Sequence, residues 1–286
     1  MSDLSAPTAI ILAAGKGTRM KSDLPKVLHP IGGRPMVRAV VDACRGAGCG
    51  RVILVVGYKQ ELVREALADD PTVEFAVQEE QLGTGHAVVS AAPLMQREAA
   101  AGGNAVFVLA GDGPLIRAAT LRTLLDRHRS TGSLATLATS VIDDPSGYGR
   151  IVREPMHAAP GSPLGRFVGI VEHKDAAPEQ LKIREVNPSY YCFDARALFA
   201  ALARVTPNAS SGEYYITDVP GLLLAEGERV EVIDAVPPED VLSINTPEQL
   251  AAVDAIFRGR AGLQGEGDGG GAKTARGGAG ERGDNP

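Results

Sequence analysis

Cysteine is scarce in this sequence, with only three among 286 residues. They are Cys44, Cys49 and Cys192, and their spacing matches no zinc-binding pattern. An odd number of cysteines does not suit a disulfide framework either, so we expect reduced, inert thiols in a reducing compartment. This scarcity argues against small disulfide-stapled folds and zinc modules.

Excess positive charge and long apolar runs are also lacking. The net charge is -6 and the isoelectric point is near 5.5, whereas a general nucleic-acid-binding protein would present a basic face. No apolar run approaches the roughly 18 residues of a membrane-spanning helix, and residues 1–8 lack the features of a signal peptide. We therefore expect a cytoplasmic protein with neither a nucleic-acid nor a membrane partner, although a local cluster of cations could bind a small polyanion.

The first half of the chain alternates short apolar runs with segments of helical periodicity. Such runs predict buried strands, and periodic apolar positions predict helices. This alternation is typical of an α/β protein whose sheet is covered by helices on both faces and binds ligands beyond the carboxyl ends of its strands. The predicted strands are 8–13, 51–56, 73–77, 105–109 and 134–141, and the predicted helices are 35–47, 61–67, 85–92 and 118–128.

The second half changes rhythm, but we expect it to extend the same sheet. From residue 259 onward, eleven of the last 28 residues are glycine, and such a segment buries too little apolar surface to offset its ordering entropy. We therefore predict one domain over residues 1–258 and a disordered glycine-rich tail over 259–286. Further β-like pieces are predicted at 149–153, 165–172, 183–193 and 230–235, and helices at 195–203, 216–225 and 247–257.

A glycine-rich turn follows the first predicted strand and reads L-A-A-G-K-G-T-R-M over residues 12–20. It fits neither a P-loop, which needs a second glycine-lysine pair, nor the dinucleotide fingerprint, whose third glycine is absent here. Exposed amides in such a turn bind anions, and arginine and lysine suit phosphate oxygens. We assign Arg19 and Lys26 to phosphate binding and treat Lys16 and Lys21 as solvated surface lysines.

Two further stretches place polar groups after predicted strands. Q-E-E-Q-L-G-T-G-H-A begins at Gln78, whose amide offers a donor and an acceptor to a pyrimidine edge. Gly83 and Gly85 would let the backbone approach a base, but the stretch also fits an ordinary turn capped by Thr84. L-A-G-D-G-P-L carries Asp112 after a strand, where a carboxylate suits a magnesium ligand among phosphates or simply caps the next turn.

Polar groups of the second half suit recognition of a polyhydroxyl ligand. Gly149 in G-Y-G-R-I, Glu172 in V-E-H-K-D-A and Asn187 in E-V-N are small or hydrogen-bonding groups on later strands, although each fits a surface position equally well. Asn245 in S-I-N-T-P offers a neutral oxygen to a hard metal ion, or shapes the turn into the last helix. The stretch G-E-Y-Y-I-T-D begins at Gly212.

In combination these motifs resemble the nucleotidyltransferases that join a nucleoside triphosphate to a sugar phosphate. Within that group the chain resembles the uridyltransferase half of the bacterial bifunctional enzymes that acetylate glucosamine-1-phosphate and then make UDP-N-acetylglucosamine. The similarity extends over residues 10–257. It implies a Rossmann-like nucleotidyltransferase fold with a mostly parallel, mixed sheet, Mg²⁺ as cofactor, and transfer of UMP from UTP to N-acetylglucosamine-1-phosphate.

The resemblance also implies a role for each candidate residue. Arg19 and Lys26 would be catalytic, and Asp112 and Asn245 would hold Mg²⁺. The sugar would contact Gly149, Glu172, Asn187 and Asn245. The nucleotide would be bound by Leu12, Ala13, Ala14, Gly15, Lys26, Gln78, Gly83, Thr84, Ala110, Gly111 and Asp112.

The sequence departs from the resemblance near the sugar and after residue 257. Ala110 and Gly113 stand where relatives have an aromatic and a branched residue, and Pro188 and Ser189 replace the usual pair after the asparagine. The hexapeptide repeat of the family's second, acetyltransferase half is not found, so we expect no trimer mediated by that β-helix. Two alternatives stay open: a transferase for another sugar-1-phosphate or for dTTP, and a non-catalytic regulator that binds nucleotide sugars.

Overall fold

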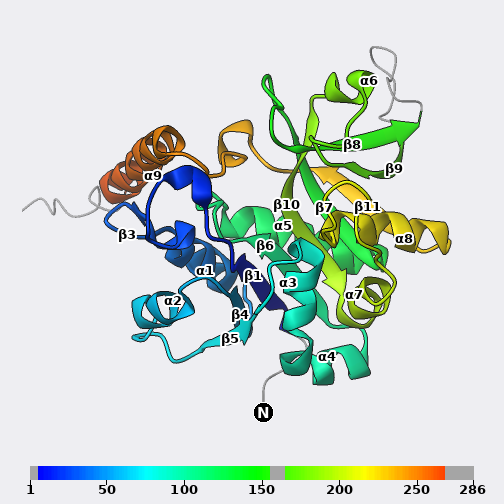
Figure 1. The fold of residues 1–286 in the computed structure, drawn as a ribbon, viewed down its shortest axis with the longest axis horizontal. Helices are drawn as coiled ribbons and strands as arrows, with labels where there is room; N and C mark the ends of the chain where they lie inside the picture. The colour runs from blue at the N-terminus through cyan, green and yellow to red at the C-terminus, as the bar shows by residue number, and fades with distance from the viewer. Residues whose placement is uncertain (1–5, 155–164, 268–286) are drawn as a thin grey trace, which may run out of the picture.

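The computed structural model describes residues 6–154 and 165–267 and arranges them around one mixed sheet with helices on both faces (Figure 1). Strands follow one another across it in the order β11-β7-β10-β6-β1-β4-β5, and β8 and β9 extend it from β10. A separate hairpin consists of β2 (Pro30–Ile31) and β3 (Arg34–Pro35). The strands of the sheet are β1 (Thr8–Ala13), β4 (Arg51–Val56), β5 (Val73–Val77), β6 (Ala105–Ala110), β7 (Ala135–Val141), β8 (Gly149–Glu154), β9 (Arg166–Val171), β10 (Glu185–Asp194) and β11 (Val230–Asp234).

Most helices fall close to their predicted positions, whereas α4 and α6 were not predicted. No helix in the described part of the chain is long and apolar enough to cross a membrane. Short 3-10 helices are η1 (Thr18–Met20), η2 (Lys26–Leu28), η3 (Ala92–Leu94), η4 (Ile216–Asp218) and η5 (Pro238–Asp240). The α-helices are α1 (Met36–Gly46), α2 (Gln60–Ala66), α3 (Thr84–Ser90), α4 (Gln96–Ala101), α5 (Ala118–Thr131), α6 (Pro178–Leu181), α7 (Ala195–Leu202), α8 (Val219–Ala225) and α9 (Pro247–Gly267).

Two hydrophobic cores lie on opposite faces of the sheet, because successive side chains of a strand point to opposite sides. In β4, Val52, Leu54 and Val56 belong to one core, and Ile53 and Val55 belong to the other. The first core is covered by α1, α2 and α5, and the second by α3, α7 and α8. Strands that are apolar on both sides are therefore buried on both sides, as the sequence predicted.

The order of the strands creates a crevice beside β1. This strand pairs in parallel with β4 on one side and with β6 on the other, while β10 runs antiparallel to β6 and β7. The chain passes from β1 to β4 and β5 and then returns to β6 on the opposite side, which makes β1 a topological switch point. Ligands of such sheets bind beyond the carboxyl ends of the strands at this point.

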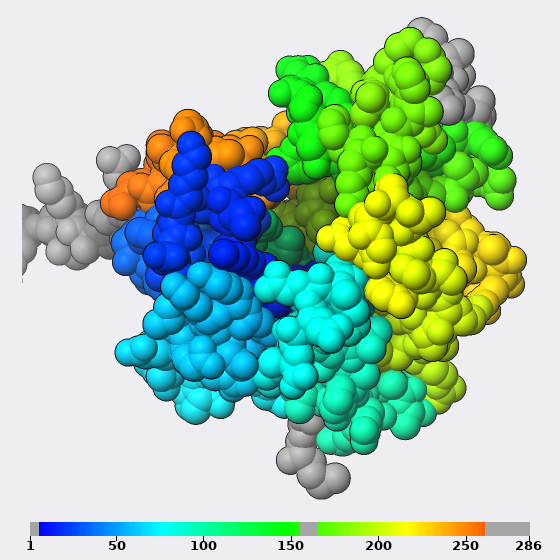
Figure 2. All heavy atoms as spheres, in the orientation of Figure 1, coloured from blue at the N-terminus to red at the C-terminus, as the bar shows by residue number. Residues whose placement is uncertain are grey.

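The second half of the chain extends the same sheet, as expected. β10 inserts between β6 and β7, and β11 pairs with β7 at the edge. β8 and β9, together with α6, project from the sheet beside β10 (Figure 1). The two halves therefore face each other across one hollow, which Figure 2 shows between the N-terminal loops in blue and the later segments in green and yellow.

The last helix is longer than predicted, since α9 continues to Gly267 whereas the sequence predicted an end at residue 257 and disorder from 259. Two arginines anchor this extension. Arg258 Nε donates to Asp254 Oδ2 at 2.7 Å, and Arg260 donates to Leu115 O at 3.2 Å and forms an ion pair with Asp240. The remainder of the predicted tail, 268–286, lies outside the described residues.

Candidate active site

Two cavities meet at the carboxyl ends of β1 and β6, beside the antiparallel strand β10. The larger has a volume of about 330 Å³ and the smaller about 200 Å³. Ala110, Asp112 and Ser189 line both, so the two spaces adjoin at these residues. The site is therefore divided into two compartments with a shared boundary.

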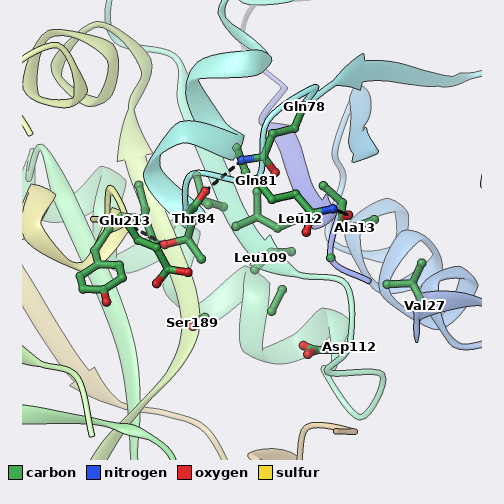
Figure 3. A pocket seen from close by; sticks show the side chains of 18 of the residues that line it. Leu12, Ala13, Val27, Gln78, Gln81, Thr84, Leu109, Asp112, Ser189 and Glu213 are labelled. Carbon is green, nitrogen blue, oxygen red and sulfur yellow. Dashed lines mark hydrogen bonds between the residues drawn. The ribbon is translucent and has the colours of Figure 1, made fainter. Parts of the chain in front are cut away.

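The larger cavity is the one that the sequence assigned to the nucleotide. All of the residues predicted for that role line it except Gly111. Gly111 lies directly behind the wall, because its amide donates to Leu12 O at 2.9 Å and a Cβ there would lie 2.8 Å from that oxygen. Glycine at this position lets the end of β6 close against the end of β1. Several of the lining side chains are shown in Figure 3: Leu12, Ala13, Gln78, Thr84 and Asp112.

Four polar side chains from distant parts of the chain gather beside the shared boundary. Lys26 forms an ion pair with Asp112 and donates from Nζ to Asn245 Oδ1 at 3.0 Å. Arg19 Nη2 donates to the same Asn245 oxygen at 2.7 Å. The structure thus brings together both residues predicted to act on phosphates and both predicted to hold a metal ion.

The local sequence explains how Lys26 reaches this cluster. Pro25 precedes η2, and Val27 and Leu28 anchor that short helix in the core. Gly17 has φ of 67°, and a Cβ on it would lie 2.6 Å from Lys26 Cβ. The glycine-rich turn therefore needs glycine here both for its left-handed backbone and for close contact with the lysine stem.

The donor set at this cluster fits a hard divalent cation. The Asp112 carboxylate and the Asn245 amide oxygen both lie against Lys26 Nζ, so a single positive charge already occupies the space between them. No group of three or more His, Cys, Asp or Glu side chains suitable for a metal occurs among the described residues. A cation held here would take its other ligands from phosphate oxygens and water, as Mg²⁺ commonly does.

Gln78 is placed as predicted, but its amide is partly used within the protein. Its side chain is buried (Figure 3). Its Nε2 donates to Gly83 O at 3.1 Å and lies 3.1 Å from His86 Nδ1. Its Oε1 has no hydrogen-bond partner among the residues that the structure describes. Gln78 therefore offers a ligand an acceptor, whereas the sequence suggested both a donor and an acceptor.

The glycines of Q-L-G-T-G allow close packing within the protein, and Gly83 also lines the larger cavity. A Cβ on Gly83, whose φ is 104°, would lie 2.5 Å from Tyr214 O, and one on Gly85 would lie 3.1 Å from the same atom. Thr84 does not cap α3, because the helix follows Gly83 and Thr84 Oγ1 accepts from Ile216 N at 3.1 Å. These contacts join the first half of the chain to the G-E-Y-Y-I-T-D segment.

Three of the four residues predicted to contact the sugar line the smaller cavity: Gly149, Glu172 and Asn187. Burial raises the pKa of Glu172 above its ordinary value, although Thr217 Oγ1 donates to its Oε1 at 3.0 Å and opposes that shift. Asn245 is not among the residues that line this cavity, and it lies instead with Lys26 and Arg19.

Several cavity residues were not singled out from the sequence. Gln81 donates from Nε2 to Ala14 O at 2.8 Å and so ties the second motif to the glycine-rich turn. Gln81 and Glu213 belong to motifs that the sequence did quote, so their positions could have indicated them. Ser189 was noted only as a departure from the usual pair after the asparagine. Tyr191 carries no such signal, because only the folding of β10 brings it to the cavity.

Comparison with known proteins identifies the family of this chain. Residues 9–213 match the MobA-like NTP transferase domain. The bifunctional protein GlmU of Heliobacterium modesticaldum is 45% identical over 253 residues, which is 88% of this chain and 52% of that protein. The GlmU of Geobacter metallireducens is 46% identical over 260 residues, or 91% of this chain and 52% of that protein. The chain thus spans about half the length of these relatives.

Solved structures show the same fold. The crystal structure of UDP-glucose pyrophosphorylase complexed with UDP-glucose has a TM-score of 0.68 and 18% identity, and covers 89% of this chain and 99% of its own. The apo form of UDP-glucose pyrophosphorylase also has a TM-score of 0.68, with 17% identity. At such identity the similarity concerns the fold alone. Given the match over residues 9–213, the chain belongs to the MobA-like NTP transferase domain family.

Proposed function

We propose that the chain is a UDP-N-acetylglucosamine diphosphorylase, which transfers UMP from UTP to N-acetylglucosamine-1-phosphate and releases pyrophosphate. The observation that carries this proposal is the pair of adjoining cavities with Lys26, Asp112 and Asn245 beside their boundary. A nucleotide in the larger cavity and a sugar in the smaller one would bring their phosphates together at this cluster. The similarity to GlmU proteins over 88–91% of the chain supports the choice of base and sugar.

In the proposed reaction, an oxygen of the sugar phosphate attacks the α-phosphorus of UTP in line. A new P–O bond forms, the bond between the α-phosphorus and the bridging oxygen breaks, and pyrophosphate leaves with that electron pair. A phosphate monoester is mostly dianionic at neutral pH, because its second pKa is about 6, so no general base is needed. The obstacle is repulsion between two polyanions, and Lys26 and Arg19 would offset it by binding the phosphates.

Nucleotidyltransferases of this type generally use a divalent metal ion, and we propose Mg²⁺ here, held by Asp112 and Asn245. The ion would supply charge neutralisation to the phosphates. Lys26 contacts both of these residues, so its ammonium group can move from them to a phosphate oxygen when substrates arrive. The same lysine would thereby keep the two ligands in place in the absence of substrate.

Sugar recognition would fall to the smaller cavity. The Glu172 carboxylate can accept hydrogen bonds from sugar hydroxyls, and the Asn187 side chain of β10 lines the same cavity. A Cβ on Gly149 would lie 3.1 Å from Ile170 Cγ2 and 3.7 Å from Asn187 Cβ, so glycine leaves room in this wall.

Release of pyrophosphate from UTP, Mg²⁺ and N-acetylglucosamine-1-phosphate tests the proposal directly. A panel with other sugar-1-phosphates and with dTTP tests the alternative substrates, and UDP-N-acetylglucosamine should appear in step with pyrophosphate. No pyrophosphate above background with any pair would leave a non-catalytic binding protein as the better reading. We further propose that residues 1–286 form no β-helix-mediated trimer, because they contain no hexapeptide repeat. Sedimentation equilibrium measures the oligomeric state.

A further inference from the structure

Ser189 has a backbone conformation that non-glycine residues rarely adopt. Its φ is 64°, in the left-handed region, which it shares with Lys21 and Lys59 alone among the described residues other than glycine. This conformation is unfavourable for a residue with a Cβ, and it persists where the surrounding structure imposes it. Such positions gather at functional sites.

An irregularity in β10 places Ser189 between the two cavities. The pairing of β10 with β7 shifts register between Val186 and Tyr190. Within this interval Asn187 Oδ1 accepts a hydrogen bond from Ser189 N at 3.2 Å, which holds the distorted backbone. As a result Ser189 lines both cavities, together with Ala110 and Asp112.

Hydrogen bonds fix the side chain next to Ser189. Asn187 Nδ2 donates to the buried Tyr191 hydroxyl at 2.6 Å, and Asn187 Oδ1 accepts from Ser189 N. Asn187 therefore holds the backbone that carries the Ser189 hydroxyl to the boundary between the cavities. A hydroxyl can donate to a ligand at this boundary, where a carboxylate such as that of Asp112 can only accept.

We propose that Ser189 is a further substrate-binding residue, whose hydroxyl donates a hydrogen bond to the phosphate group of the sugar 1-phosphate. The proposal rests on the proposed function, because it assumes a sugar in the smaller cavity and a nucleotide in the larger. The phosphate of the sugar is the group that must lie at the boundary for transfer to occur. An anionic acceptor also strengthens the bond relative to one made to a sugar hydroxyl.

Two substitutions at Ser189 separate the effect of the hydroxyl from the effect of the left-handed backbone conformation. Ser189→Gly removes the hydroxyl and suits the left-handed conformation, whereas Ser189→Ala removes the hydroxyl and keeps the strain. Both should lower kcat/KM for N-acetylglucosamine-1-phosphate by about 10- to 100-fold, the range for a lost hydrogen bond to a charged group. Both should leave KM for UTP within about twofold. Only Ser189→Gly should raise the midpoint of thermal unfolding, by about 1–3 °C.

Different results would overturn the role of Ser189 and the proposed function on which it rests. A Ser189→Gly variant with wild-type kcat/KM would show that the hydroxyl is dispensable and would overturn the inference alone. A rise in KM for UTP, with sugar phosphate kinetics unchanged, would overturn it as well, because the hydroxyl would then face the nucleotide. A wild-type protein that releases no pyrophosphate with any sugar 1-phosphate would remove the proposed function and the inference with it.

Discussion

Charge at the boundary between the cavities is carried by a few individual side chains. Lys26 contacts both Asp112 and Asn245, and these residues are 86 and 219 positions away in the sequence. Lys26→Ala and Asp112→Ala should each lower the rate of uridyl transfer by about 100-fold or more, because the first removes a positive charge that offsets the phosphates and the second removes a proposed ligand of Mg²⁺. Steady-state release of pyrophosphate measures this, with circular dichroism to show that the fold is intact.

Lys16 provides the matched control for that prediction. It belongs to the same glycine-rich turn, but its ammonium lies over the Tyr58 ring, 5.4 Å from the centroid, and the residue is exposed. Lys16→Ala should therefore stay within about twofold of the wild-type rate. Near-normal turnover in either the Lys26 or the Asp112 variant would contradict the roles given to them.

Glu172 should make sugar recognition depend on pH. Burial raises its pKa, so the carboxylate that accepts hydrogen bonds is protonated, and lost as an acceptor, at a higher pH than an ordinary glutamate. Wild-type kcat/KM for the sugar phosphate should exceed that of Glu172→Gln by about tenfold near pH 8, and the ratio should fall towards one as the pH is lowered, starting at a higher pH than for an ordinary glutamate.

The ratio of kcat/KM for the wild type to kcat/KM for Glu172→Gln isolates the ionisation of Glu172. The sugar phosphate itself titrates with a second pKa of about 6, but this affects both enzymes and cancels in the ratio. The sign for stability is opposite to that for binding, since a raised pKa in the folded state favours folding at low pH and loses that contribution as the pH rises through it. A ratio that stays constant across the range would rule out a role for the carboxylate.

At the level of helices and strands, much of the fold could be predicted because the strands are apolar on both faces. Six-residue runs such as β1 and β4 read directly as buried strands. The sequence did not reveal α4 and α6, whose six and four residues carry no apolar periodicity. Nor could it show that β10 lies antiparallel between β6 and β7, because strand order is decided by packing of distant segments.

Part of the candidate site could also be predicted, because it depends on the predicted strands. Residues that follow strands, such as Gly15 and Asp112, must lie at the carboxyl edge of the sheet once the strands are known. The internal hydrogen bonds of Gln78 and the left-handed backbone of Ser189 depend on contacts across the fold. Such features have no local pattern in the sequence and needed the three-dimensional structure.

The contact between the α3 turn and the segment before η4 should be sensitive to a single added carbon. In Gly83→Ala the new Cβ would meet Tyr214 O at 2.5 Å, in addition to the strain of a left-handed backbone. We expect a loss of about 2–4 kcal/mol in the free energy of unfolding, together with a rise in KM for UTP because Gln78 and Thr84 would move. Denaturant titration and steady-state kinetics measure the two effects.

Gly33→Ala separates backbone strain from the steric clash. Gly33 has φ of 83°, and a Cβ on it would meet no atom within 4 Å. Its substitution should cost only about 1 kcal/mol and leave KM for UTP unchanged. Equal destabilisation by the two substitutions would mean that Tyr214 does not press on Gly83 in solution.

On the scale of the whole molecule, the C-terminal helix α9 packs against η5 and so supports the segment that carries Asn245. Asp240 in η5 is buried and forms ion pairs with Arg117 and with Arg260 of α9. The same region is tied to the second half of the chain, because Tyr190 Oη donates to Asp240 O at 3.2 Å. The segment that follows η5 carries Asn245, so α9 helps to position a residue of the proposed metal site.

Two neighbouring arginines of α9 allow this coupling to be tested. Arg260→Met removes one partner of the buried Asp240 and should lower the free energy of unfolding by about 1–3 kcal/mol, which corresponds to a fall of about 2–8 °C in the midpoint. It should also lower the apparent affinity for Mg²⁺, since Asn245 loses part of its support. Arg258→Met removes only an ion pair with the partly exposed Asp254 and should change the stability by less than about 1 kcal/mol. Differential scanning calorimetry and Mg²⁺-dependent kinetics report the two effects, and equal responses of the two variants would show that α9 covers the domain without supporting the site.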